Sequence, residues 1–171
     1  MTAAALLGAA GCGGGNGKVP AADVRSYVAA VEKVRLPVNS LLNGADPILD
    51  AYHHHRITPE QASERMGALE STFAAYLLKM QQIDPSNSQL QAINAPYART
   101  YFYEDSYLAT LASDLSEGDF DNLPDTQDAQ RLAIIVWRTK LELIAAKSGV
   151  TLPADIQQAG RGEIAPSPGG S

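Results

Sequence analysis

Apolar residues recur every three or four positions between Ala62 and Ile83, the spacing of one face of an α-helix. Thr58 and Gln61 form a capping-box pair before this pattern, and Pro59 occupies the first helical position. The pattern therefore predicts a helix over 59–83. Its predicted core-facing residues are Ala62, Met66, Leu69, Phe73, Tyr76, Met80 and Ile83.

A second helical pattern follows this one. Ser86 and Gln89 stand in the capping relation at its start, and Gly118 is placed to end it in a left-handed conformation. Pro96 lies inside the pattern, so we expect a kink or a split there. The predicted core-facing residues are Tyr97, Tyr101, Glu104, Leu108, Leu111 and Leu115.

The last helix is predicted to begin after Asp125 or Thr126, either of which suits an N-cap, and to close at Gly149. Its predicted core-facing residues are Ala129, Leu132, Val136, Leu143 and Ala146.

The first helical pattern is the least regular. Val24, Tyr27, Val28, Val31 and Val34 have helical spacing, and apolar spacing resumes after an interrupted stretch. We expect kinks at the prolines rather than separate helices. The interrupting residues are Pro37, Gly44 and Pro47.

No stretch alternates polar and apolar residues for long enough to predict a strand. Four amphipathic helices joined by short turns predict an all-α fold. The simplest arrangement is an antiparallel four-helix bundle with up-down-up-down connectivity and a kinked first helix.

The composition fits one globular domain with tails, since 45% of the 171 residues are hydrophobic and 19% are charged. The net charge of −6 comes without a cluster of Lys and Arg, which argues against nucleic acid as a partner. A single cysteine, Cys12, excludes an internal disulfide and a zinc site built on cysteines.

Cys12 follows a short stretch of alanine, leucine and glycine over 3–11. This stretch resembles a bacterial lipoprotein signal that ends in a lipobox. The resemblance implies that residues 1–11 are removed and that Cys12 carries a diacylglycerol group, which anchors the chain to the extracytoplasmic face of the cell membrane. The alternative is a disordered Ala/Gly tail that happens to contain a thiol.

The predicted organisation has four parts. A signal peptide over 1–11 precedes a lipidated Cys12 and a Gly-rich tether over 12–19. A helical domain occupies 20–158, and a Pro/Gly-rich tail over 159–171 is predicted to be disordered. This layout resembles that of uncharacterised small helical lipoproteins of high-GC bacteria.

All three histidines lie together at 53–55. Consecutive helical residues point about 100° apart, so they do not converge on one metal. Asp50 shares a helix face with His53 and with His54, which makes these three residues weak metal candidates. A solvated helix end is the expected role of this cluster.

Tyr97, Tyr101 and Glu104 share one predicted helix face. A carboxylate on such a face is costly unless it is paired, and Arg138 is the predicted partner. The pair is interpreted as a buried ion pair that fixes helix register, with a ligand pocket as the alternative.

Enzymatic motifs and cofactor motifs are absent from the sequence. We find no Gly-x-Ser-x-Gly elbow, phosphate loop or dinucleotide fingerprint. The Glu-x-x-His pair of di-iron bundles and the Cys-x-x-Cys-His of covalent haem are also missing. The sequence therefore predicts neither an enzyme nor a cofactor.

Two functional hypotheses remain. The first is a non-catalytic interaction or scaffold module that binds another envelope protein through an exposed apolar patch. The second is a small-ligand or metal-binding protein with a pocket between helices. A minor alternative comes from Ile57-Thr58-Pro59-Glu60-Gln61, which is similar to the helix start of periplasmic stress chaperones of the Spy and CpxP type.

Overall fold

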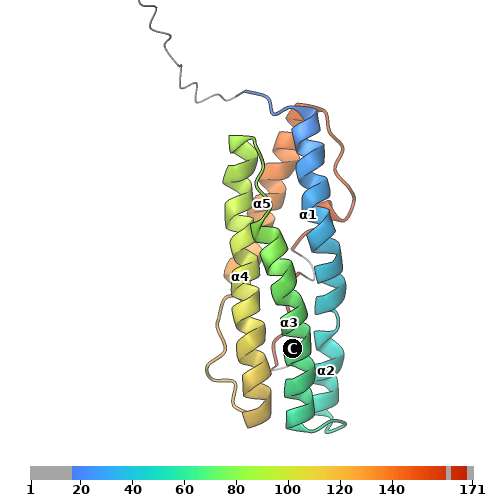
Figure 1. The fold of residues 1–171 in the computed structure, drawn as a ribbon, viewed down its shortest axis with the longest axis vertical. Coiled ribbons are helices and arrows are strands. Elements are labelled where there is room, and N and C mark those ends of the chain that lie inside the picture. The colour runs from blue at the N-terminus through green and yellow to red at the C-terminus, as the bar shows by residue number, and fades with distance from the viewer. Residues whose placement is uncertain (1–16, 161–162, 169–171) are drawn as a thin grey trace, which may run out of the picture.

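The computed structural model describes residues 17–160 and 163–168, and all regular structure within them is helical (Figure 1). The predicted all-α class is confirmed, and the long helices pack as a bundle. None of the described helices has the length and apolar character needed to cross a membrane. The elements are α1 (Ala21–Leu42), α2 (Ala45–His53), α3 (Pro59–Gln81), α4 (Ser88–Glu117), α5 (Gln127–Ser148) and a 3₁₀ turn, η1 (Ile156–Gln158).

The first arm of the bundle is two helices rather than one kinked helix. α1 continues through Pro37, and the break comes at Asn43 and Gly44. The Gly44 N–H donates to the Leu41 carbonyl at 2.9 Å, and a Cβ at Gly44 would lie only 3.0 Å from that oxygen. Because the helix restarts here, Pro47 lies in the first turn of α2. Backbone N–H groups in a first turn make no intrahelical hydrogen bond, so a proline there costs none.

The start of α3 agrees with the prediction. The Gln61 N–H donates to Thr58 Oγ1 at 3.2 Å, and the Thr58 N–H donates to Gln61 Oε1 at 3.0 Å. This capping box satisfies two backbone donors that the first turn would leave unpaired. Leu77 is buried on the core face, whereas Tyr76 is half-buried.

α4 is continuous past Pro96, and Gly118 closes it with φ of 69°. Asn87, not Ser86, caps its start, because Asn87 Oδ1 accepts a hydrogen bond from the Gln89 N–H at 2.9 Å. The error is one residue, and both side chains are suited to capping. Every residue predicted on its core face is buried.

α5 begins after Thr126 and ends at Gly149, but its predicted core face was wrong. All five residues predicted to face the core are exposed, with Leu132 at 63% and Leu143 at 58%. α5 carries two apolar stripes of helical spacing, and periodicity cannot choose between them. The stripe that faces the core contains Ile134, Trp137, Leu141 and Ala145.

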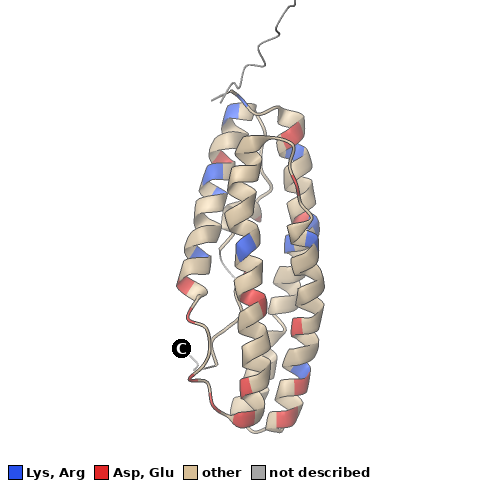
Figure 2. Cartoon of the chain, turned by 60° about the vertical axis from the view of Figure 1, so that its left-hand side comes forward, with Lys and Arg blue, Asp and Glu red and all other residues tan. Residues whose placement is uncertain are grey.

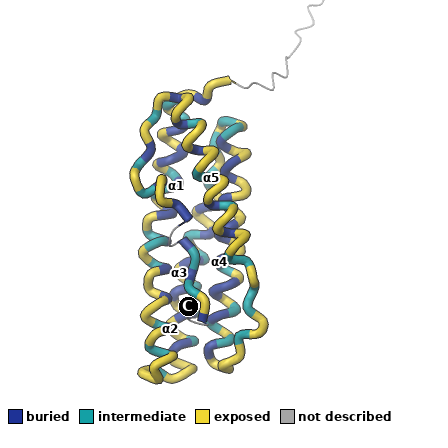
Figure 3. The backbone as a smooth tube through the Cα atoms, turned by 180° about the vertical axis from the view of Figure 1, so that it is seen from behind, coloured by how far each residue is buried: buried dark blue, intermediate teal, exposed yellow. Residues whose placement is uncertain are grey.

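The C-terminal segment also differs from expectation. We expected disorder over 159–171, yet its described part, 159–160 and 163–168, lies along the bundle (Figure 3). Ala159, Glu163 and Ala165 are buried there. The segment has no periodic apolar pattern, so composition alone suggested a tail. Individual polar contacts hold it instead.

The rotation of α5 can be tested with two leucines on the same helix. Leu141→Ala removes a fully buried side chain and should lower the free energy of unfolding by about 2–5 kcal/mol. Leu143→Ala truncates an exposed side chain and should change it by no more than about 0.5 kcal/mol. Urea denaturation of both variants measures the difference, and the opposite ranking would show that the α5 register is wrong.

Candidate functional site

An aromatic and polar cluster lies at the centre of the bundle. The Tyr97 ring from α4 stacks on Trp137 from α5 with ring centroids 4.0 Å apart. Trp137 Nε1 donates to the Tyr27 hydroxyl at 2.8 Å, and that hydroxyl donates to Asn94 Oδ1 at 3.1 Å. Burial raises the pKa of the Tyr27 hydroxyl, so it stays protonated and available as a donor. The cluster joins α1, α4 and α5.

Arg35 on α1 is the cation of this core, and the sequence pattern gave no signal for it. The side chain is buried, and its Nε donates to Glu163 Oε1 at 2.5 Å. The guanidinium also donates to the Asp155 carboxylate and, at 2.9 Å, to the Asp155 carbonyl. Because Glu163 lies in the segment predicted to be disordered, no partner for a core arginine was apparent.

The Glu163 carboxylate beside Arg35 is electrostatically perturbed. Burial raises the pKa of Glu163, and the neighbouring Arg35 partly offsets this effect. The Tyr97 hydroxyl lies 3.5 Å from the second Glu163 oxygen, at the limit of a hydrogen bond. These contacts fix the C-terminal segment to α1 and α4.

Glu104 forms a second attachment point for the segment. Its Oε1 accepts a hydrogen bond from the Ala165 N–H at 2.7 Å, while Oε2 has no protein partner. Burial raises the pKa of Glu104 to about 7, and the bond from Ala165 acts in the opposite direction. Two further bonds hold this stretch, from the Tyr107 hydroxyl to the Pro166 carbonyl and from Gln127 Nε2 to the Ala165 carbonyl.

The predicted pairing of Glu104 with Arg138 was wrong. Arg138 donates to the carbonyls of Gln157 and Ala159 at 3.2 and 3.0 Å, and approaches Glu142 at 3.9 Å. Arg138 therefore holds the turn around η1 at the edge of the core. The rotation of α5 explains the error, because it turns Trp137 inward and leaves the next residue at the edge of the core.

Tyr97, Tyr101 and Glu104 are brought together as predicted, but they do not form a ligand pocket. The cavity bounded by Tyr101, Glu104 and Glu163 has a volume of about 10 Å³. That is the space of one water molecule. The interhelical pocket expected beside these residues is thus filled by protein.

The histidine cluster marks a helix end. α2 ends at His53, and His54 Nδ1 lies 2.8 Å from the Asp50 carbonyl oxygen. Asp50 also pairs with Arg56. Within residues 17–160 and 163–168, no three histidine, cysteine or acidic side chains are grouped closely enough to hold a metal.

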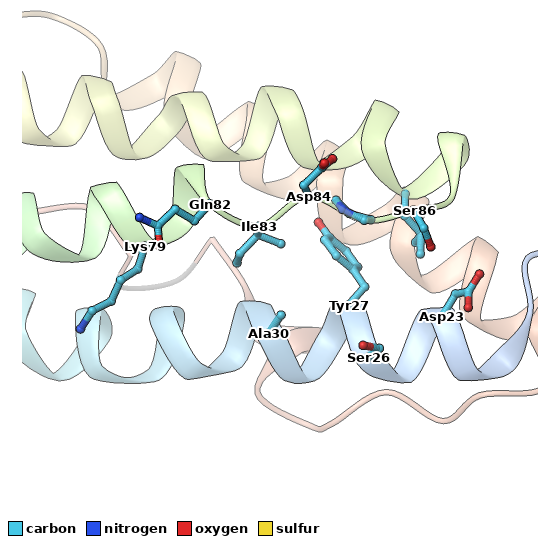
Figure 4. A pocket seen from close by; sticks show the side chains of 11 residues that line it. Asp23, Ser26, Tyr27, Ala30, Lys79, Gln82, Ile83, Asp84 and Ser86 are labelled. Carbon is cyan, nitrogen blue, oxygen red and sulfur yellow. The ribbon is translucent and has the colours of Figure 1, made fainter.

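Four open grooves lie on the described surface, and two of them are bounded by residues of the candidate sites. One of about 390 Å³ lies between α1 and the connection from α3 to α4 (Figure 4). Tyr27 points across this groove toward the connection, while Lys79 and Asp23 lie at opposite ends, so their charges do not converge. The other, of about 480 Å³, is bounded by Asp46, His53 and part of the C-terminal segment.

Among the described helices, α5 has the most large apolar side chains exposed to solvent. We define the outer stripe as Ala129, Leu132, Val136, Thr139, Leu143 and Ala146, all of which are exposed. On the other helices the large exposed apolar side chains are Leu36 on α1, Leu78 on α3, and the adjacent Phe102 and Tyr103 on α4. In Figure 2, acidic and basic residues are interspersed along the helices, without a broad basic surface on the side drawn.

Comparisons with known proteins add no relative. The chain matches no protein-family model, and searches of curated proteins and of solved structures find no match.

The role of Arg35 can be separated from that of Arg138 by truncation. Arg35→Ala leaves Glu163 buried without its cation and should lower the free energy of unfolding by about 3 kcal/mol or more. Arg138→Ala removes partly exposed contacts and should cost about 1 kcal/mol. Equal losses in chemical denaturation would contradict the assignment of Arg35 as the core cation.

Glu104 should make stability depend on pH. Its pKa is raised from 4.5 to about 7 in the folded protein, so folding favours the protonated form. This contribution is fully present below pH 4.5 and is lost as pH rises through about 7, a change on the order of 3 kcal/mol.

Denaturation curves at pH 5 and pH 8 measure this dependence. Glu104→Gln keeps an acceptor for the Ala165 N–H and should flatten the change between the two pH values. Glu64→Gln, at an exposed glutamate on α3, is the control and should leave it unaltered. An unchanged pH profile in Glu104→Gln would show that this carboxyl titrates normally.

Proposed function

We propose that this chain is a lipid-anchored extracytoplasmic protein that acts as a non-catalytic interaction or scaffold module of the cell envelope. The anchor in this proposal is a diacylglycerol group on Cys12, after removal of residues 1–11. Both lie outside the described residues, so the proposal rests on the likeness of the stretch before Cys12 to a lipobox signal. Two acyl chains suffice for stable residence in a membrane.

The start of the described chain supports this geometry. The Gly17 carbonyl accepts a hydrogen bond from Gln89 Nε2 at 2.7 Å, and the Val19 carbonyl accepts one from Ser148 Oγ at 2.7 Å. Residues 17–19 are thereby held at the end of the bundle where α4 starts and α5 finishes. An anchor on Cys12 would place that end toward the membrane.

We also infer up-down-up-down connectivity for the four arms of the bundle. The same two hydrogen bonds support it, because they bring the start of α1, the start of α4 and the end of α5 together. The short connection over 82–87 brings the end of α3 to the same place.

The outer stripe is the observation that carries the interaction function. It gathers Leu132, Val136 and Leu143 on the face of α5 opposite the core, with exposed fractions of 63%, 39% and 58%. A soluble helix normally places such residues inward. A contiguous apolar surface on a folded protein commonly marks an interaction site.

A second candidate function, binding of a small ligand, is favoured by one feature. The groove of about 480 Å³ beside His53 is large enough for a small molecule and places Asp46, Asp50 and Arg131 on its walls. Calorimetric titration with small anions, small cations and divalent metals would detect such binding.

The anchor is tested by intact mass and membrane partition of the wild-type chain and of Cys12→Ala, expressed in a bacterium that processes lipoproteins. The wild type should lack residues 1–11, carry added acyl mass and sediment with membranes, because two acyl chains hold it there. Cys12→Ala should lose the acyl mass and the membrane association. A wild-type mass equal to the full unmodified chain would overturn the proposed anchor.

A further inference from the structure

The outer stripe has the repeat of a coiled-coil seam. Its residues are separated by alternating steps of three and four, which is the spacing of the a and d positions in a heptad repeat. From Ala129 to Ala146 the stripe is about 27 Å long. The opposite face of α5 packs into the bundle core through Trp137 and Leu141. The helix therefore has two apolar faces, one buried in the core and one exposed as the outer stripe.

We propose that the outer stripe is a self-association surface on which a second copy of this chain packs α5 against α5 in parallel. This inference deepens the proposed interaction function and rests on it. The two seams would meet around a two-fold axis that runs along the helices, so each residue of the stripe faces its own counterpart.

Thr139 is the polar member of the stripe, but its hydroxyl is already hydrogen-bonded within α5, so the residue can be covered by an apolar surface. Its hydroxyl donates to the Ile135 carbonyl on the same helix at 2.9 Å. The hydroxyl proton therefore already has an acceptor when a second helix covers it. The methyl group of Thr139 can then fill the seam between Val136 and Leu143.

The charges beside the stripe favour a second copy as the occupant. Along one edge the e positions are Ala133, Lys140 and Lys147, and along the other the g positions are Asp128, Ile135 and Glu142. In a parallel pair the g edge of one helix faces the e edge of the other, so Glu142 meets the partner's Lys147. The weak approach of Arg138 to Glu142, at 3.9 Å, does not compete strongly with that pairing.

The parallel orientation is favoured over the antiparallel one. An antiparallel pair with the same packed layers would place Lys140 beside the partner's Ala133 and Glu142 beside the partner's Ile135, so no opposite charges meet. In the parallel pair Lys140 faces the partner's Ile135 as well, and the preference comes from the contact of Glu142 with the partner's Lys147, which the two-fold axis repeats. A parallel pair also brings both copies of residues 17–19 to the same end. Two lipid anchors could then enter one membrane, where confinement raises the effective concentration of the second copy.

Sedimentation equilibrium of the full chain carrying Cys12→Ala tests the association. One helix pair is a small interface, so we expect a monomer–dimer equilibrium with a dissociation constant in the micromolar range. Leu132→Glu and Leu143→Glu each bury a charge in the seam and should weaken it by at least about 100-fold. Leu78→Glu, at a leucine on α3 that is 59% exposed, is the matched control and should leave the constant unchanged.

Circular dichroism spectra and melting temperatures of these variants must match those of the parent chain, because the stripe does not contribute to the monomer core. A parent chain that remains monomeric at millimolar concentration would overturn the proposal. Equal weakening by Leu78→Glu would overturn the assignment of the outer stripe.

Single cysteines in the Cys12→Ala chain test the orientation. In a parallel pair, Leu132→Cys and Leu143→Cys should each oxidise to a disulfide-linked dimer on their own. An antiparallel pair would give a rapid cross-link only when the two variants are mixed, and that result would contradict the parallel arrangement.

Photo-crosslinking in cells separates this inference from the broader function. A photoreactive residue at position 143 of the lipidated chain should give a product of twice the chain mass, and the same residue at position 78 should not. A stripe-specific product of another mass would overturn self-association and leave the interaction function in place. If position 143 gives no more cross-linked product than position 78, both self-association and the interaction function are overturned.

Discussion

The orientation of Trp137 is the constraint on which the rest of the structure depends. Its indole stacks on Tyr97 at 4.0 Å and donates to the Tyr27 hydroxyl, so one residue of α5 engages both α4 and α1. A large aromatic ring gains most when it is fully buried and its N–H is satisfied. This position on α5 meets both conditions, and the rotation of the helix follows from it. The apolar residues on the opposite face are left in solvent as the outer stripe.

The same arrangement explains how a segment without apolar periodicity becomes part of the fold. Arg35 enters the core from α1 and requires a counter-charge, which Glu163 supplies from far along the chain. Glu104 accepts the Ala165 N–H a short distance away. The C-terminal segment is thus attached through buried polar bonds. Because burial raises the pKa of both Glu104 and Glu163, folding favours their protonated forms and the folded state is less stable at alkaline pH.

The sequence predicted the elements well and their relations less well. Local signals were sufficient for the capping box at Thr58 and the left-handed ends at Gly118 and Gly149, because such chemistry depends on adjacent residues. Periodicity placed the core face of α4 correctly, since that helix has one apolar stripe. It failed for α5, which has two stripes. The pairing of Arg35 with Glu163 is long-range and has no local signature.

The central claim is that α5 directs Trp137 inward and offers the outer stripe to a second copy. Carbene footprinting across a concentration series measures both parts in one experiment. At low concentration Leu132, Val136 and Leu143 should be labelled while Ile134 and Leu141 are protected, and labelling of the stripe alone should fall as the concentration rises. Strong labelling of Ile134 and Leu141, or a stripe whose labelling does not change with concentration, would contradict this account.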